Sequence, residues 1–213
     1  MLIQTQAGLL PSTKQQTLVN APGGTFGEFL KSNLSPDYYT LAKNGKLFTS
    51  ALAGIATVTA FVGGAAGTPL IGLYNPAGSG IDLVLLEAVV GIRTTGTTAA
   101  TLDFNHWGVN QGGVAVTGTA TAPRSMNAFN ATGSVASAMQ NVANTGALAS
   151  ALLRPSISVG NATTTAGLNA GLFRDELKGE IIVGPGCYYA FGASAALAVA
   201  GIDVSLMWAE IPT

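Results

Sequence analysis

From residue 51 onward, short runs of apolar and β-branched residues alternate with clusters of Gly, Pro, Asn and Thr. Runs of this length, bounded by turn residues, predict strands rather than helices. The expected strands cover residues 52–62, 69–75, 81–93, 100–108, 122–129, 150–159, 180–183, 187–193 and 201–210. Many short strands with Gly and Pro turns favour two packed sheets. We therefore expect an all-β fold, an antiparallel jelly-roll sandwich.

Two of these strands show which side chains belong to the core. In the last strand, alternate positions are apolar and share one face, namely Ile202, Val204, Leu206 and Trp208, whereas the other face holds Asp203, Ser205, Met207 and Ala209. In residues 81–93 the even positions from Val84 to Ile92 are wholly apolar, and the odd positions are apolar except for Glu87 and Arg93. The last strand is predicted to be half-buried, and the strand at 81–93 to be central and buried on both sides for much of its length.

The first 50 residues differ from the rest. Residues 1–25 contain Pro11, Pro22 and Gly23-Gly24 and have little periodicity, which predicts an extended arm. Short β-type pieces follow at 26–30, 37–41 and 46–49, and the Asn44-Gly45 pair is a hairpin signal. We therefore divide the chain into an N-terminal arm with short β pieces, residues 1–50, and a jelly-roll domain, residues 51–213. Residues 130–150 are compatible with a short helix from Ser134 to Asn144 or with an insertion loop.

Charged residues are scarce, with nine basic and ten acidic side chains in 213 residues. Charged residues make up 9% of the chain, against roughly 25% in a typical soluble domain, so we expect other subunits to cover much of the surface. A net charge of -1 provides no field that would collect nucleic acid. Catalysis needs titratable groups held close together, and here they are scattered. We expect a structural protein without enzymatic activity, cofactor or nucleic-acid partner.

The candidates for chemistry fit structural roles. His106 would need an orienting carboxylate to act as a base, and Asp103, three residues away on a strand, lies on the opposite face. One histidine and one cysteine, Cys187, cannot form a tetrahedral metal shell of nitrogen and sulfur, whereas a calcium site of Asp and Glu oxygens stays open. Cys187 is expected to be a small buried hydrophobe. The charge run 174–180 is predicted to be a solvated loop before the strand at 181, or else an ion-pair patch between subunits. In it, Asp175 and Glu176 point away from each other if the backbone is extended.

Two long uncharged stretches, residues 47–81 and 181–202, raise the question of a membrane span. Repeated Gly and Pro interrupt both stretches, so we expect no transmembrane helix. Residues 1–6 have neither a basic region nor a long apolar region, unlike a secretory signal. We therefore expect synthesis and assembly in a cytoplasm.

Several ordered features resemble those of virion proteins of tailed bacteriophages. They are Gly27-Glu28, Asp37-Tyr38-Tyr39, Gly45-Lys46-Leu47-Phe48, the turn at 73–80 followed by the apolar run 83–86, and the closing segment Trp208-Ala209-Glu210-Ile211-Pro212. Among such proteins the chain looks most like jelly-roll cement or decoration proteins. The resemblance implies a homotrimer on the outer surface of the capsid that binds the major capsid protein and stabilises the head.

Four aromatic residues near the arm are the candidates for binding such a partner: Phe26, Phe29, Tyr38 and Tyr39. Aromatic anchors carry much of the energy of protein contacts. The same four residues are equally compatible with the core of the domain. The alternative function is a tail, fibre or spike component that contacts a host glycan.

Overall fold

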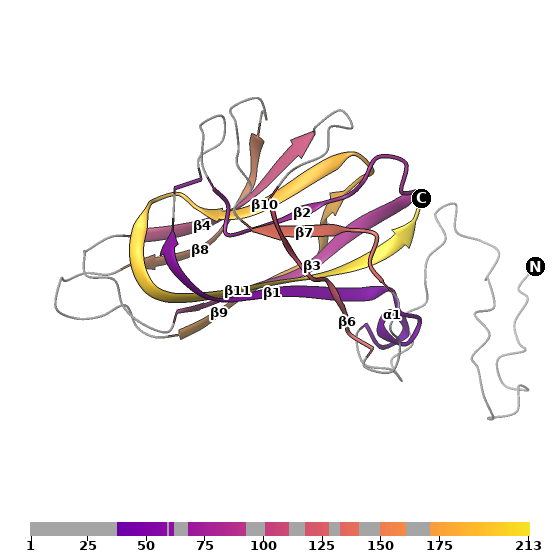
Figure 1. Ribbon diagram of the computed structural model, residues 1–213, viewed down its shortest axis with the longest axis horizontal. Helices are drawn as coiled ribbons and strands as arrows, with labels where there is room; N and C mark the ends of the chain where they lie inside the picture. Colours follow the sequence, from indigo (N-terminus) through magenta and orange to yellow (C-terminus); the bar gives the residue numbers. More distant parts are fainter. Residues whose placement is uncertain are drawn as a thin grey trace, which may run out of the picture. The chain divides into compact units, whose positions relative to one another are not determined.

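The computed structural model describes residues 38–58, 60–61, 68–92, 101–110, 118–127, 133–140, 150–160 and 171–213 (Figure 1). Residues Asp37–Thr213 form a compact unit separate from Met1–Pro36. The predicted arm of residues 1–25, with Phe26 and Phe29, lies outside the described residues.

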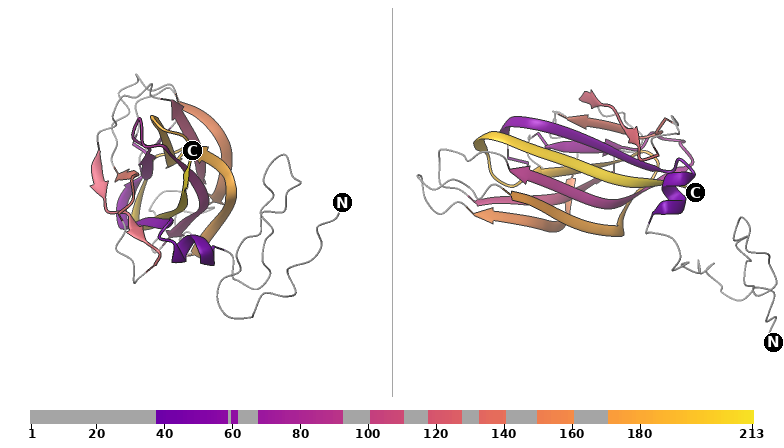
Figure 2. Two further views of the ribbon diagram at one scale, coloured as in Figure 1. Left: turned by 90° about the vertical axis from the view of Figure 1, so that its right-hand side faces the viewer. Right: turned by 90° about the horizontal axis from the view of Figure 1, so that it is seen from below.

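The described residues form one short helix and eleven strands. They are α1 (Tyr39–Lys43), β1 (Leu47–Val58), β2 (Ile71–Tyr74), β3 (Ile81–Ile92), β4 (Thr101–Asn110), β5 (Thr119–Thr121), β6 (Arg124–Ser125), β7 (Ser137–Gln140), β8 (Ser150–Gly160), β9 (Gly171–Val183), β10 (Cys187–Ala193) and β11 (Leu197–Pro212). The strands form a five-stranded sheet, β6-β1-β11-β3-β9, and a six-stranded sheet, β5-β7-β2-β10-β4-β8. The two sheets form the layers seen in Figure 2, and neighbouring strands in each are antiparallel. The prediction of an all-β antiparallel sandwich is confirmed.

The strand pairs are nested along the chain. β1 pairs with β11, β2 contacts β10, β3 pairs with β9 and β4 pairs with β8, so the first strand meets the last and the middle strands meet each other. The region between β4 and β8 extends both sheets, with β6 beside β1 and with β7 and β5 beside β2. Within residues 133–140 the backbone forms β7 instead of the helix considered from Ser134 onward, because Ser137–Gln140 completes the ladder on β2.

The main core lies between the sheets, and β11 contributes the face that the alternation predicts. Ile202, Val204, Leu206 and Trp208 are buried there. Trp208 stacks on Phe48 of β1, with ring centroids 6.2 Å apart. Cys187 is half-buried and packs against this core from one end of β10. These contacts make β11 the central hydrophobic element of its sheet.

β3 is central, as predicted, but its inward face changes partway along the strand. The odd-numbered Leu83 and Leu85 lie in the core at the start of the strand, whereas the even-numbered Ala88 and Val90 lie in the core further along. A register shift against β11 accounts for the change. Leu85 lies opposite Trp208 and Glu87 opposite Met207, so β3 has one extra residue here, which turns every later side chain to the other face. Leu86 therefore belongs to a separate cluster. The uniform apolar face predicted for the even positions faces the main core only from Ala88 onward.

The beginning of the compact unit differs from the prediction. The β piece expected at 37–41 is the start of helix α1, and Tyr38, which precedes the helix, has a left-handed backbone with φ of 66°. The predicted Asn44-Gly45 hairpin is instead the turn that ends α1, where the Gly45 amide donates to the Ala42 carbonyl at 3.0 Å. β1 begins at residue 47, so the domain boundary predicted after residue 50 falls inside this strand.

Candidate functional site: the outer face of the five-stranded sheet

Helix α1 covers one end of the outer face of the five-stranded sheet. Leu47, Leu86 and Ala209 form a buried cluster on this face, and Tyr38, Leu41, Ala42, Val84 and Met207 pack against it. The cluster brings together α1, β1, β3 and β11, which are far apart in the sequence. The face therefore has one end sealed by side chains of the chain itself, and the other end forms the candidate site.

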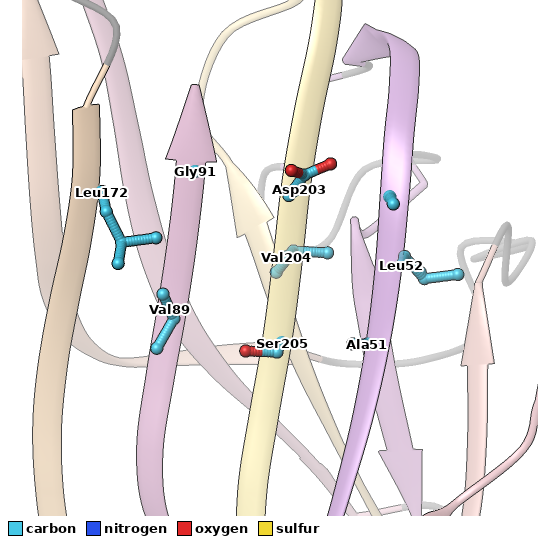
Figure 3. Close-up of a pocket in the computed structure, with 9 residues that line it drawn as sticks. Ala51, Leu52, Val89, Gly91, Leu172, Asp203, Val204 and Ser205 are labelled. Atoms are coloured by element: carbon cyan, nitrogen blue, oxygen red, sulfur yellow. The ribbon is translucent and has the colours of Figure 1, made fainter. Parts of the chain in front are cut away.

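The other end of the same face has a shallow apolar hollow of about 300 Å³ (Figure 3). Four neighbouring strands supply its lining, which includes Ala51, Ala53, Val89, Gly91, Leu172 and Ser205. Small side chains at these positions leave the sheet open, and Leu172 on β9 stands beside them with 76% of its surface exposed. We refer to these six residues as the bare face.

The charged groups near the bare face already have partners. The Asp203 carboxylate accepts a hydrogen bond from the Gly54 amide at 2.9 Å. The Arg174 guanidinium donates to Glu87 at 2.5 Å, and this hydrogen bond is the main reason that the pKa of Arg174 is raised. Paired charges and aliphatic lining give a surface suited to another neutral, apolar protein surface.

The structure describes two of the four predicted partner-binding residues. Tyr38 is partly buried against the cluster under α1, so it serves the packing of its own domain. Tyr39 is half exposed, and the Lys43 ammonium lies 5.8 Å from its ring centroid. Neither residue lines the hollow. Phe26 and Phe29 lie outside the described residues, so their predicted role remains a prediction.

The bare face could not be predicted from the sequence. Its residues are Ala, Val, Gly, Leu and Ser on four strands, and the only local signal is the alternation that turns Leu172 away from the core while Phe173 faces it. Which strands lie side by side is decided by the nested pairing. The set of lining residues therefore becomes visible only in the folded chain.

A second feature is a buried polar network centred on His106 of β4, which is fully buried. Its Nδ1 lies 2.5 Å from the Tyr189 hydroxyl on β10, and its Nε2 lies 2.9 Å from Asp175 Oδ2 on β9. Arg154 Nη2 donates to Asp175 Oδ1 at 2.9 Å, and the Ser156 hydroxyl donates to Oδ2. The orienting carboxylate is therefore Asp175 rather than the neighbouring Asp103.

This network corrects the prediction for residues 174–180. They are part of β9 instead of a solvated loop, and Asp175 is 9% exposed while Glu176 faces solvent. The two carboxylates do point away from each other, as expected for an extended backbone. An acidic residue is tolerated inside because two other strands, β4 and β8, supply donors to it. Those strands are distant in sequence, so the local charge run gave no indication of the burial.

Burial and partners shift the pKa values within the network. Burial lowers the pKa of His106, although Asp175 acts in the opposite direction. Burial also tends to raise the pKa of Asp175, but hydrogen bonds from Ser156 and His106 and the charge of Arg154 outweigh it, so the pKa is lowered. Burial raises the pKa of Tyr189 well above its usual range. His106 is therefore a neutral imidazole between the Tyr189 phenol and the Asp175 carboxylate.

Among the described residues, no three His, Cys, Asp or Glu side chains are grouped so that they could hold a metal ion. Within the same ranges, no helical segment is long and apolar enough to cross a bilayer. No known family model, curated protein or solved structure matches this chain. The bare face and the buried network are thus the features from which a function can be argued.

Proposed function

We propose that this chain is a structural virion protein, a capsid cement or decoration protein of a tailed bacteriophage. It would bind the major capsid protein on the outer shell, as a homotrimer, and stabilise the head after assembly in the host cytoplasm. The observation that carries the proposal is the bare face, where a hollow of about 300 Å³ lies beside the exposed Leu172 and the charged groups nearby already have partners. An exposed apolar surface of this kind is typical of proteins that work in contact with other subunits.

The order of the strands supports the resemblance to jelly-roll proteins. We interpret β1-β11-β3-β9 and β2-β10-β4-β8 as the two four-stranded sheets of a jelly roll, with β5, β6 and β7 as additions. Eight strands that pair first with last, as two Greek keys, define that fold. A fold alone does not fix a function. The strand order therefore supports only the jelly-roll fold, and the bare face supports the proposed contact with the capsid.

The edge strands β8 and β9 favour contact with other subunits through the faces of the sheets over contact by pairing of edge strands. β8 and β9 are the last strands of their sheets. β8 contains Pro155, β9 carries an inward acidic residue at Asp175, and the backbone turns left-handed at Lys178 and Gly179. Proline, inward charges and irregular backbone are the means by which proteins keep sheet edges from pairing. This leaves the sheet faces as the surfaces for assembly.

The test is to add the purified protein to heads of the encoding phage that lack it. We expect saturable cosedimentation with the heads, one fixed site per group of capsid subunits in cryo-microscopy, and heads that survive higher temperature. Absence of binding at micromolar protein, or localisation of the chain to the tail, would contradict the proposal. Localisation to the tail together with saturable binding in a glycan screen would establish the alternative, a tail, fibre or spike component.

A further inference from the structure

The polar network on His106 joins the two sheets at the edge of the sandwich where β8 and β9 end them. His106 and Tyr189 belong to the six-stranded sheet, and Asp175 belongs to the five-stranded sheet. Arg154 on β8 donates to both Asp175 and Glu180 of β9. Each of these edge strands has a backbone ladder on one side only, with β4 and with β3. The side-chain network is therefore the polar connection between the strands across this edge.

Hydrogen bonding fixes the proton positions in the network. An ionised carboxylate only accepts, so His106 Nε2 carries the proton that it donates to Asp175. Nδ1 is then unprotonated, and its lone pair accepts a hydrogen bond from the Tyr189 hydroxyl at 2.5 Å. The raised pKa of Tyr189, caused by its burial, keeps this phenol protonated. The neutral imidazole thus uses both of its nitrogens.

A second proton on the imidazole has no place in this arrangement. It would bind at Nδ1 and reverse the bond, so that the Tyr189 hydroxyl would have to accept. The phenol proton would then need another acceptor. Tyr189 is 1% exposed, and no other hydrogen bond of its hydroxyl occurs among the described residues. An orphaned buried donor and an extra charge close to Arg154 both oppose this state.

We propose that the Tyr189–His106–Asp175–Arg154 network is an acid-sensitive latch that holds the β8–β9 edge closed at neutral pH and releases it in mild acid. The charged and titratable groups that face His106 are Tyr189 from β10, Asp175 from β9 and Arg154 from β8. Glu180 reaches the network only through Arg154. The inference does not depend on the proposed function, because it concerns the chain alone.

The direction of the pH effect follows from proton binding. The pKa of His106 is lowered by burial, so below about pH 6.5 an open edge binds a proton that the closed edge does not. The opening equilibrium then rises by up to about tenfold for each pH unit until the lowered pKa is reached. Asp175, whose pKa is lowered by its donors, stays ionised at pH 5. The effect between pH 7.5 and 5 is therefore assigned to the histidine.

The experiment is amide hydrogen exchange on the full chain at pH 7.5 and pH 5, corrected for intrinsic exchange. We expect protection in β8 and in residues 171–177 of β9 to be lower at pH 5 than at pH 7.5, by up to about tenfold for each pH unit below 6.5, with β1 and β11 unchanged. In the variant His106→Gln, whose amide donates to Asp175 without titrating, the edge should keep its protection. Protection that is unchanged at pH 5 in the native chain, or lost equally in His106→Gln, would overturn the latch.

A second measurement applies if His106→Gln does not fold. The chain has a single histidine, so its imidazole resonances can be followed by NMR without assignment. We expect a midpoint below pH 6.5 that coincides with the loss of protection at the edge. A midpoint near 6.5 in a chain whose edge stays protected would contradict the proposal.

Discussion

Replacing Leu172 by Glu removes the most exposed of the large apolar side chains in the described residues. Full burial of a leucine contributes roughly 1.5 to 3 kcal/mol. Because 76% of Leu172 is exposed, a partner that covers it gains about 1 to 2 kcal/mol from this side chain. Glu at this position loses that gain and buries an unpaired carboxylate. We expect Leu172→Glu to weaken binding to the capsid at least about tenfold.

Stability of the isolated chain should hardly change. Leu172 already faces solvent, so its replacement should alter the free energy of unfolding by less than about 0.5 kcal/mol. The matched control is Ile182→Glu, since Ile182 is 59% exposed, lies on the same strand and does not line the hollow. This control should leave capsid binding unchanged.

Cosedimentation titrations measure the dissociation constants, and urea denaturation measures the two stabilities. The reasoning is refuted if Leu172→Glu binds like the native chain, or if both variants lose binding equally. A loss of stability above 1 kcal/mol in Leu172→Glu would show that the side chain serves the fold instead.

Three further substitutions test the packing and the network, each by urea denaturation. Gly72→Ala should lower the free energy of unfolding by about 1 to 3 kcal/mol, because its Cβ would lie 1.8 Å from the Tyr188 hydroxyl oxygen; an unchanged midpoint would contradict the close approach. Tyr188→Phe should be neutral or stabilising by up to about 1 kcal/mol, since this buried hydroxyl has no hydrogen-bond partner in the described part of the chain; a large loss would reveal one. Asp175→Asn should lower the free energy of unfolding by about 2 kcal/mol at pH 7. The native carboxylate has a lowered pKa, so its contribution is present above pH 3.8 and is lost as the pH falls through the folded value. The stability gap between native and variant chains should therefore narrow in acid, and a constant gap would count against the role of the charge.

The strands with regular alternation could be predicted from the sequence, because burial on one face imposes a period of two. β11 is the clearest case, with Trp208 and its three alternate neighbours in the core. β3 was placed correctly, but its change of inward face could not be read locally, since the shift at Leu86 arises from its pairing with β11. Register is a property of two strands, and one strand alone does not contain it.

The elements that were predicted wrongly depend on distant partners. Residues 39–43 form a helix because α1 can bury its apolar side against Leu47 and Ala209, although consecutive tyrosines favour a strand. Asp175 is buried because Arg154, Ser156 and His106 supply hydrogen bonds from two other strands. Propensity and charge describe the neighbours in sequence, whereas these positions are decided by neighbours in space.

The position of β11 affects how the chain can fold during synthesis. β11 lies between β1 and β3 in the five-stranded sheet, yet it begins 150 residues after β1 begins (Figure 1). Until the ribosome has released Leu197–Pro212, both neighbouring strands lack their shared partner, and the buried surface of Phe48 stays uncovered. Folding through such distant contacts is slow, and nascent chains with uncovered edges aggregate readily. We therefore expect a growing chain of this kind to need protection from aggregation, as chaperones provide, until β11 emerges.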